Sequence, residues 1–268
     1  MNTWMEHEPL LRLVPFVGIF AVMVVWELYR PRRPLDAPKS YRWLNNLGLV
    51  VVNSLVLRLL FPGAAVGVAL LAEQYQWGLF HLTGLSSAWP LMTLILALVV
   101  LDGLIWAQHW LFHHVPLLWR LHRLHHADVD LDVTSGLRFH PLEILLSMLI
   151  KAVVITVLGV PVLAVLVFEI WLNVMAMFNH ANIRLPQQLD AKLRWLVVTP
   201  DMHRVHHSWH TDETNSNFGF NLSCWDRWFG TYRAQPRDGH ESMILGLPYF
   251  RHLRDARLDR LLAQPFVR

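Results

Sequence analysis

The sequence predicts an all-α protein that crosses a membrane several times and carries a histidine-rich helical cap on its cytoplasmic side. Three observations predict this class. Hydrophobic residues make up 54% of the 268 residues and charged residues only 16%, against about 45–50% and about 25% in ordinary soluble domains. The chain contains four long apolar tracts, and no segment alternates with the period of a strand. Its sixteen histidines are the third observation, because membrane residence does not explain them.

The apolar tracts define the membrane segments in chain order. A helix rises about 1.5 Å per residue and needs about 20 apolar residues to cross a bilayer. The tracts lie at about 13–28, 44–72, 90–110 and 142–178. The last tract is nearly twice the required length and holds Gly159 and Pro161 near its middle. We therefore expect it to form a helical hairpin that leaves the membrane on the side it entered.

The basic residues predict the orientation of these segments. Lysine and arginine gather in 30–43, in 113–141 and from 179 onward, whereas the loop 73–88 has none. With one net crossing at each of the first three tracts and a hairpin at the fourth, the basic stretches fall on one face. The positive-inside rule makes that face cytoplasmic. We predict a single domain over 1–268, with a cytoplasmic cap built from 113–141 and 179–268.

Composition also limits the kinds of partner and site. The formal net charge is only +3 and no basic tract is present, so we expect no nucleic-acid partner. The single cysteine, Cys224, excludes an internal disulfide and a metal cage made of cysteines. No HExxH, nucleophile-elbow, phosphate-loop or CxxCH pattern occurs. The chemistry of the site therefore falls to histidines and carboxylates.

The histidines form three clusters with the spacing of metal ligands. An HxxxH cluster ends the third apolar tract, and a His-Arg-x-His-His pentad occurs at 122–126 and again at 203–207. Residues i, i+3 and i+4 share one face of a helix, so each pentad presents three imidazoles and the first cluster presents two. The predicted ligands are His109, His113, His122, His125, His126, His203, His206 and His207. Eight nitrogen donors exceed what one tetrahedral zinc ion uses, and they suit two transition-metal ions.

Further polar residues are candidates for supporting this site. His180 follows the fourth tract and is the best candidate for an additional ligand. Asp102 lies seven residues before His109 on the same helix face, where it either orients a ligand imidazole or packs against a neighbouring helix. The other candidates for residues that support the ligands are His140, Asp201 and His210.

The three clusters, in this order, resemble those of the fatty acid hydroxylase and sterol desaturase superfamily. The resemblance covers about 97–235, with a fainter match at "WELYRPRRP". It implies a membrane enzyme that uses two iron ions and O2 to hydroxylate or desaturate an unactivated C–H bond. The implied substrate is a lipid such as a sterol, fatty acid or sphingolipid, and the eight clustered histidines become iron ligands. It also implies a separate electron donor (a reductase, a ferredoxin or a b-type cytochrome), since no fused cytochrome domain fits in the chain.

Two other classes of function stay open on the residues alone. The histidines are able to ligate b-type haem in a membrane electron carrier, although axial haem ligands do not require HxxHH fans. They also fit a non-catalytic metal-binding or transport protein, which would need polar groups along its spans. Hydroxylation and desaturation share one kind of metal centre, so the residues leave the reaction and the lipid open.

Overall fold

The structure, a computed structural model that describes residues 6–267, is helical and contains no strand within those residues. Five helical segments are long and apolar enough to cross a membrane, which confirms the predicted polytopic, all-α class. These segments are α1 (Glu8–Tyr29), Lys39–Leu82 with α2 (Lys39–Leu60), α3 (Ala64–Gln74) and α4 (Leu79–Leu82), then α6 (Pro90–His114), α8 (Pro141–Leu158) and α9 (Val162–His180). The shorter helices are α5 (Leu85–Ala88), α7 (Pro116–His126), α10 (Gln187–Leu193), α11 (Pro200–His206), α12 (Thr211–Thr214), α13 (Cys224–Trp228), α14 (Gly239–Ser242) and α15 (Leu258–Ala263). Three 3₁₀ turns complete the described helices, at Ser135–Leu137, Leu253–Ala256 and Gln264–Phe266.

A glycine divides the long apolar tract into α8 and α9. Gly159 ends α8 with a φ of 68°, and Pro161 directly precedes α9. A Cβ atom on Gly159 would lie 2.3 Å from the carbonyl oxygen of Trp77, so this turn packs directly on the backbone before α4. Because α8 ends and α9 begins at this turn, the start of α8 near His140 and the end of α9 at His180 both lie at the opposite end of the bundle.

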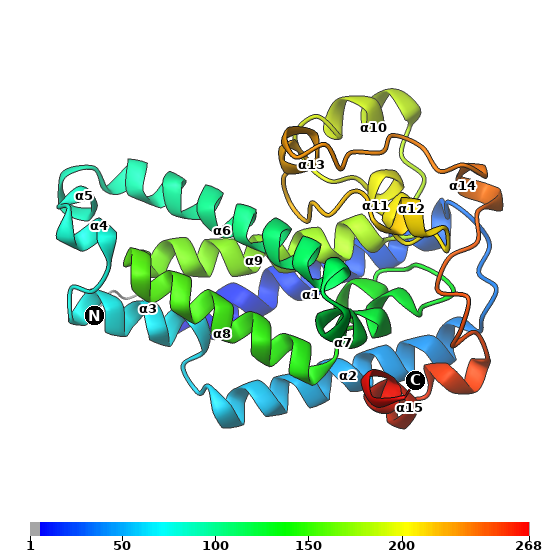
Figure 1. Cartoon of the computed structure of the whole chain (residues 1–268), viewed down its shortest axis with the longest axis horizontal. Helices are drawn as coiled ribbons and strands as arrows, with labels where there is room; N and C mark the ends of the chain where they lie inside the picture. The colour runs from blue at the N-terminus through cyan, green and yellow to red at the C-terminus, as the bar shows by residue number, and fades with distance from the viewer. Residues whose placement is uncertain (1–5, 268) are drawn as a thin grey trace.

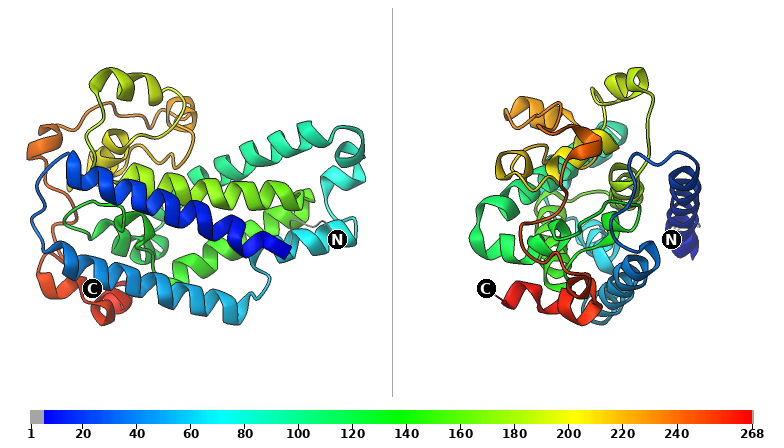
Figure 2. Two further views of the ribbon diagram at one scale, coloured as in Figure 1. Left: turned by 180° about the vertical axis from the view of Figure 1, so that it is seen from behind. Right: turned by 90° about the vertical axis from the view of Figure 1, so that its right-hand side faces the viewer.

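The spanning helices pack mainly on α8 and α9. Helices α1 and α6 pack against α9, whereas α2 packs against α8, and α3 contacts both α8 and α9 (Figure 1). Helices α1 and α2 meet through side chains: Phe20 packs on Trp43 with ring centroids 5.5 Å apart, and Lys39 Nζ lies 3.1 Å from Glu27 Oε2. The helices α10 to α15 and their loops cover one end of the bundle (Figures 1 and 2).

Buried ionic contacts attach the loop between α7 and α8 to the membrane helices. Arg42 of α2 donates to Asp128 at 2.8 Å, and Glu27 of α1 accepts from the backbone N–H of Val133 at 2.7 Å. Burial alone would raise the pKa of Asp128, but the guanidinium groups of Arg42 and Arg138 outweigh it and hold that pKa well below its usual range. The loop is therefore held by charge beside α7, the helix that carries the second histidine cluster.

Candidate metal centre

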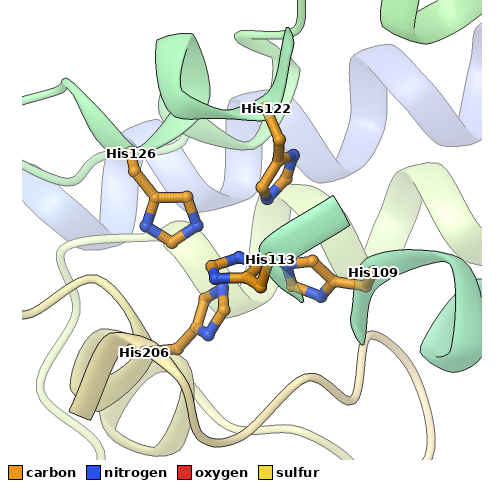
Figure 3. A group of neighbouring side chains, drawn as sticks. All are labelled: His109, His113, His122, His126 and His206. Carbon is orange, nitrogen blue, oxygen red and sulfur yellow. The ribbon is translucent and has the colours of Figure 1, made fainter. Parts of the chain in front are cut away.

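Nine histidines converge at the end of the bundle that the short helices cover. They divide into two groups, and in each group one ring nitrogen from every member lies within 4.8 Å of the others. The first group consists of His109, His113, His122, His126 and His206 (Figure 3). The second group consists of His125, His180, His203 and His207. The structure thus brings the eight predicted ligands together and adds His180, the additional candidate.

Four helices position these side chains. Helix α6 carries His109 and His113 at its C-terminal end, and α7 carries the first pentad directly after it. The second pentad occupies α11, which begins with Pro200 after Thr199; the Thr199 hydroxyl accepts from the backbone N–H of Met202 at 3.3 Å. His180 is the last residue of α9. Figure 3 shows the first group gathered from α6, α7 and α11 around one point.

Backbone carbonyls orient two imidazoles of the first group. Nδ1 of His109 donates to the carbonyl oxygen of Phe218 at 2.8 Å, and Nδ1 of His206 donates to that of Ser216 at 2.7 Å. A carbonyl oxygen only accepts, so the proton of each ring lies on Nδ1 and the lone pair on Nε2. The loop 216–218 therefore fixes the tautomer that presents Nε2 as a ligand.

Side chains orient two further imidazoles of this group. Nδ1 of His122 lies 2.6 Å from Glu143 Oε1, and both side chains are buried. Nδ1 of His113 lies 3.2 Å from Asn215 Oδ1. A carboxylate behind a ligand imidazole raises its basicity and fixes its orientation. Sequence analysis does not identify Asn215, whose only signal is its place in a polar loop after the second pentad.

The Nε2 atoms of the first group have the environment that a metal ion requires. All five are buried and make no hydrogen bond within residues 6–267. Leaving a buried polar atom unpaired costs about 1–3 kcal/mol, and here five such atoms face one point. A bound cation satisfies all of them at once, so the residues present fit a metal.

The second group leads to the same conclusion through its close contacts. Nδ1 of His180 donates to the carbonyl of Ala176 at 2.7 Å, and Nδ1 of His125 to that of Arg138 at 3.2 Å. The Nε2 atoms of these two rings therefore carry lone pairs, yet they lie 3.0 Å apart, and Nε2 of His203 lies 3.0 Å from that of His180. Facing lone pairs repel each other, and a cation between them turns the repulsion into coordination.

Burial keeps five of these imidazoles in the neutral form that binds metals. It lowers the pKa of His206 to about 3. For His125, His126, His203 and His207, burial and the neighbouring imidazoles together lower the pKa well below 6.5. Neutral imidazole suits iron, zinc, copper and nickel, so the donor set fits iron without selecting it.

A cavity of about 410 Å³ leads away from the first group. His109 and His122 line it at one end, and Arg12, Lys151 and Glu169 line it elsewhere. Most of its wall between them is apolar, from residues that include Ile105, Phe112, Leu137, Phe139, Met148, Leu172 and Phe220. A larger cavity, of about 880 Å³, lies between the end of α1 and the segment 184–190, but none of the nine histidines lines it.

Comparison with known proteins identifies the family. The model of the fatty acid hydroxylase family matches residues 94–231, just over half of the chain and all nine histidines. The chain belongs to the fatty acid hydroxylase family. The resemblance drawn from the histidine clusters is confirmed.

Several curated relatives of this family member are lipid hydroxylases or monooxygenases by name. It is 31% identical over 182 residues to the ornithine lipid hydroxylase OlsE of Rhizobium tropici, covering 66% of this chain and 51% of that protein. It is 28% identical over 209 residues to the alkylglycerol monooxygenase of Xenopus tropicalis, covering 76% and 44%. It is 27% identical over 148 residues to the cholesterol 25-hydroxylase of Rattus norvegicus, covering 53% and 47%. The chain thus spans about half the length of these relatives. No solved structure matches it.

Asp226 is a supporting residue of this hydroxylase-family site that the sequence does not reveal. Its carboxylate accepts from the backbone N–H groups of Phe218 and Gly219, both at 2.8 Å, and from Nε1 of Trp106 at 3.0 Å. These bonds hold the Phe218 carbonyl against His109. Asp226 therefore anchors the loop that fixes a ligand tautomer, although it contacts no ligand itself.

Asp102 takes the second of the two roles that the sequence leaves open. It accepts from Asn221 Nδ2 and Trp225 Nε1, both at 2.7 Å, and contacts none of the nine histidines. Seven residues along a helix are about 10 Å of rise, so Asp102 shares a face with His109 but lies too far away to reach it. Asp102 packs the loop before α13 onto α6.

The other three candidates for supporting residues also contact no imidazole of the two groups. His140 begins α8, accepting from Leu142 N at 3.1 Å, and its Nε2 lies 3.2 Å from the carbonyl of Leu262. Asp201 pairs with Arg32 at 3.1 Å and with Arg204. His210 pairs with Asp238 at 2.8 Å on the surface. Each of these side chains instead contacts residues outside the two histidine groups.

Proposed function

We propose that this chain is an O2-dependent lipid hydroxylase in which each histidine group binds one iron ion. The observation that carries the proposal is the set of nine imidazoles directed at two adjacent points beside an apolar cavity. The names of the relatives support hydroxylation over desaturation. Iron in these groups would supply the activation of dioxygen that an unreactive C–H bond requires.

The chain's own residues bind the lipid and exclude water. His109 and His122 face the cavity, so a carbon chain in the cavity lies against the first group. Apolar walls from Ile105, Phe112 and Phe220 displace water around the reacting carbon. Glu143 holds the His122 ring in place and keeps its Nδ1 protonated.

We further propose that the lipid enters from the bilayer between α1 and α2. Both helices contribute to the cavity wall, α1 through Phe16 and α2 through Val50 and Leu57. Each packs mainly on a different neighbour, α9 for α1 and α8 for α2. The basic loops favour a cytoplasmic position for the histidine end, where a separate reductase, ferredoxin or b-type cytochrome would deliver electrons.

Binding of haem is the main alternative, and the geometry disfavours it. The ring nitrogens of each group lie within 4.8 Å of one another, which leaves room for an ion but not for a porphyrin between them. The deciding experiment is a metal analysis and an absorption spectrum of the purified protein. About two non-haem iron per chain would support the proposal, and a Soret band with stoichiometric haem would overturn it.

The reaction itself is tested with isotopically labelled oxygen. Membranes that contain the protein, a reductant and host lipids are exposed to ¹⁸O2, and the lipids are analysed by mass spectrometry. A lipid that gains one labelled oxygen atom supports hydroxylation, whereas loss of two hydrogens without label indicates desaturation. His206→Ala is the control, and label incorporation at the wild-type rate in that variant would contradict the ligand assignment.

A further inference from the structure

We infer that the cavity binds a lipid with its polar head at the end away from the histidines, where Arg12 and Lys151 both pair with Glu169. This inference rests on the proposed function, but the experiment that tests it measures lipid binding and requires no enzymatic turnover. It names the substrate as an amphiphile whose carbon chain, rather than its head, lies against the histidines.

The cluster joins three membrane-spanning helices and lines the cavity. Glu169 of α9 receives Lys151 Nζ of α8 on Oε1 at 2.7 Å and Arg12 Nη2 of α1 on Oε2 at 2.8 Å. Arg12 also pairs with Glu8. Charged side chains within membrane spans are costly, and they usually mark a functional site.

The cluster has hydrogen-bond donors to spare. Both oxygens of Glu169 are engaged, whereas Lys151 keeps two of its three N–H groups and Arg12 keeps its Nη1 group. The side chains of Lys151 and Arg12 are 14% and 28% exposed, and both border the cavity.

The free N–H groups of Lys151 and Arg12 determine which chemical groups a ligand must offer at this end of the cavity. Glu8 does not line the cavity, so the free groups that the cluster presents to the cavity are N–H donors, which favour oxygen acceptors over amines. A carboxylate, phosphate or ester oxygen satisfies these donors, and a terminal methyl group leaves them unpaired in an apolar setting. The charged end of the cavity therefore favours a lipid head over a lipid tail.

Helix geometry sets the distance from this head to the histidines. Glu169 lies eleven residues before His180 on α9, about 16 Å of helix rise, and Lys151 lies eight residues after Glu143 on α8, about 12 Å. A head at the cluster thus places carbons about 12–16 Å down the chain beside the two histidine groups.

The test is a binding measurement on the purified full-length chain in detergent, with radiolabelled hexadecanoic acid, methyl hexadecanoate and hexadecane. Lys151→Met should weaken binding of the acid about tenfold or more, as expected for loss of a charge-assisted hydrogen bond. Binding of hexadecane should stay unchanged, and Lys151→Arg should restore most of the affinity for the acid. Arg58→Met is the matched control, since Arg58 is an exposed cation of α2 outside the cavity wall. Comparison of the acid with its methyl ester shows whether the site requires a negatively charged oxygen or also accepts a neutral one. Either result supports the inference.

Photoaffinity labelling of the wild-type protein keeps the inference testable if Lys151→Met fails to fold. Hexadecanoic acid with a diazirine beside its carboxylate should label α1, α8 and α9 near the cluster, and a diazirine at its methyl end should label residues near His109. The reverse pattern overturns the inference, as does an equal loss of acid and hexadecane binding in Lys151→Met. Iron-free protein serves equally well, so failure here is separate from failure of the proposed function.

Discussion

Glu143 should control how tightly the first histidine group holds its metal. Its Oε1 lies 2.6 Å from Nδ1 of His122, and both side chains are buried. Glu143→Ala leaves the Nδ1–H of His122 buried without an acceptor, which costs about 1–3 kcal/mol. Loss of such a partner behind a ligand typically weakens metal affinity about 10–100-fold. Glu143→Gln keeps an acceptor oxygen and loses only the charge, so its effect should be smaller.

The assay for Glu143 is iron retention during dialysis against a chelator series, measured by mass spectrometry of the metal. We expect the order wild type, Glu143→Gln, Glu143→Ala from tightest to weakest. His210→Ala is the matched control, because His210 contacts Asp238 and none of the nine histidines, and it should retain iron like wild type. The reasoning is refuted if Glu143→Ala holds iron as tightly as wild type, or if His210→Ala loses as much.

Three further predictions address the ligand groups, the packing and the pH dependence. His180→Ala should lower bound iron more than His113→Ala does, because it leaves three ligands in its group whereas His113→Ala leaves four in the other; equal losses would contradict this. Gly136→Ala should unfold at a lower temperature and lose iron, since its Cβ would lie 2.2 Å from a carbonyl oxygen of α9, while Gly18→Ala, with open space around its Cβ, should not. Burial lowers the pKa of His240 to about 4, so as pH falls from about 6.5 the unfolded chain takes up this proton first and stability is lost down to about pH 4. Between about pH 6.5 and pH 4 the free energy of unfolding of His240→Gln should therefore rise relative to that of the wild type by up to about 3 kcal/mol. Free energies of unfolding that change with pH in the same way in both proteins would show the reasoning to be wrong.

The membrane helices follow from hydropathy, but their ends do not. Helix α2 begins at Lys39, several residues before its apolar tract, because Arg42 is buried there in polar contacts. Its guanidinium donates to Asp128 at 2.8 Å and to Asp132 at 2.6 Å. A hydropathy pattern reads such residues as a loop, since it does not show that their partners come from another part of the chain.

The ligands are more predictable than the residues that support them. Ligand spacing is a local property of a helix, so the eight clustered histidines stand out in the sequence. The acceptor for His109 is the carbonyl of Phe218, 109 residues away. Every residue has a backbone carbonyl. The residue type therefore does not show which carbonyl accepts a hydrogen bond from a ligand imidazole in the folded chain. Asp102 shares a helix face with His109, and His210 follows the second pentad by three residues, but neither relation shows which side chains meet in the folded chain.

The structure also explains why the His-Arg-x-His-His pentad occurs twice. In α7, His122 and His126, four residues apart, belong to the first group, and the intervening His125 belongs to the second. The pentad of α11 does the reverse, giving His203 and His207 to the second group and His206 to the first. Each helix therefore contributes to both groups, and neither pentad completes one alone.

The division of each pentad between the two histidine groups should couple the two metal positions. Helix α6 completes the first group with two imidazoles, and His180 completes the second with one. Helices α7 and α11 each carry ligands of both histidine groups. A rotation of either helix about its axis therefore shifts ligands of both groups together. The two metal positions should therefore be filled and emptied in a coupled manner, and titration of iron into the metal-free protein should show positive cooperativity. Independent binding of the two ions would show that the helices adjust separately and would contradict this view of the paired pentads.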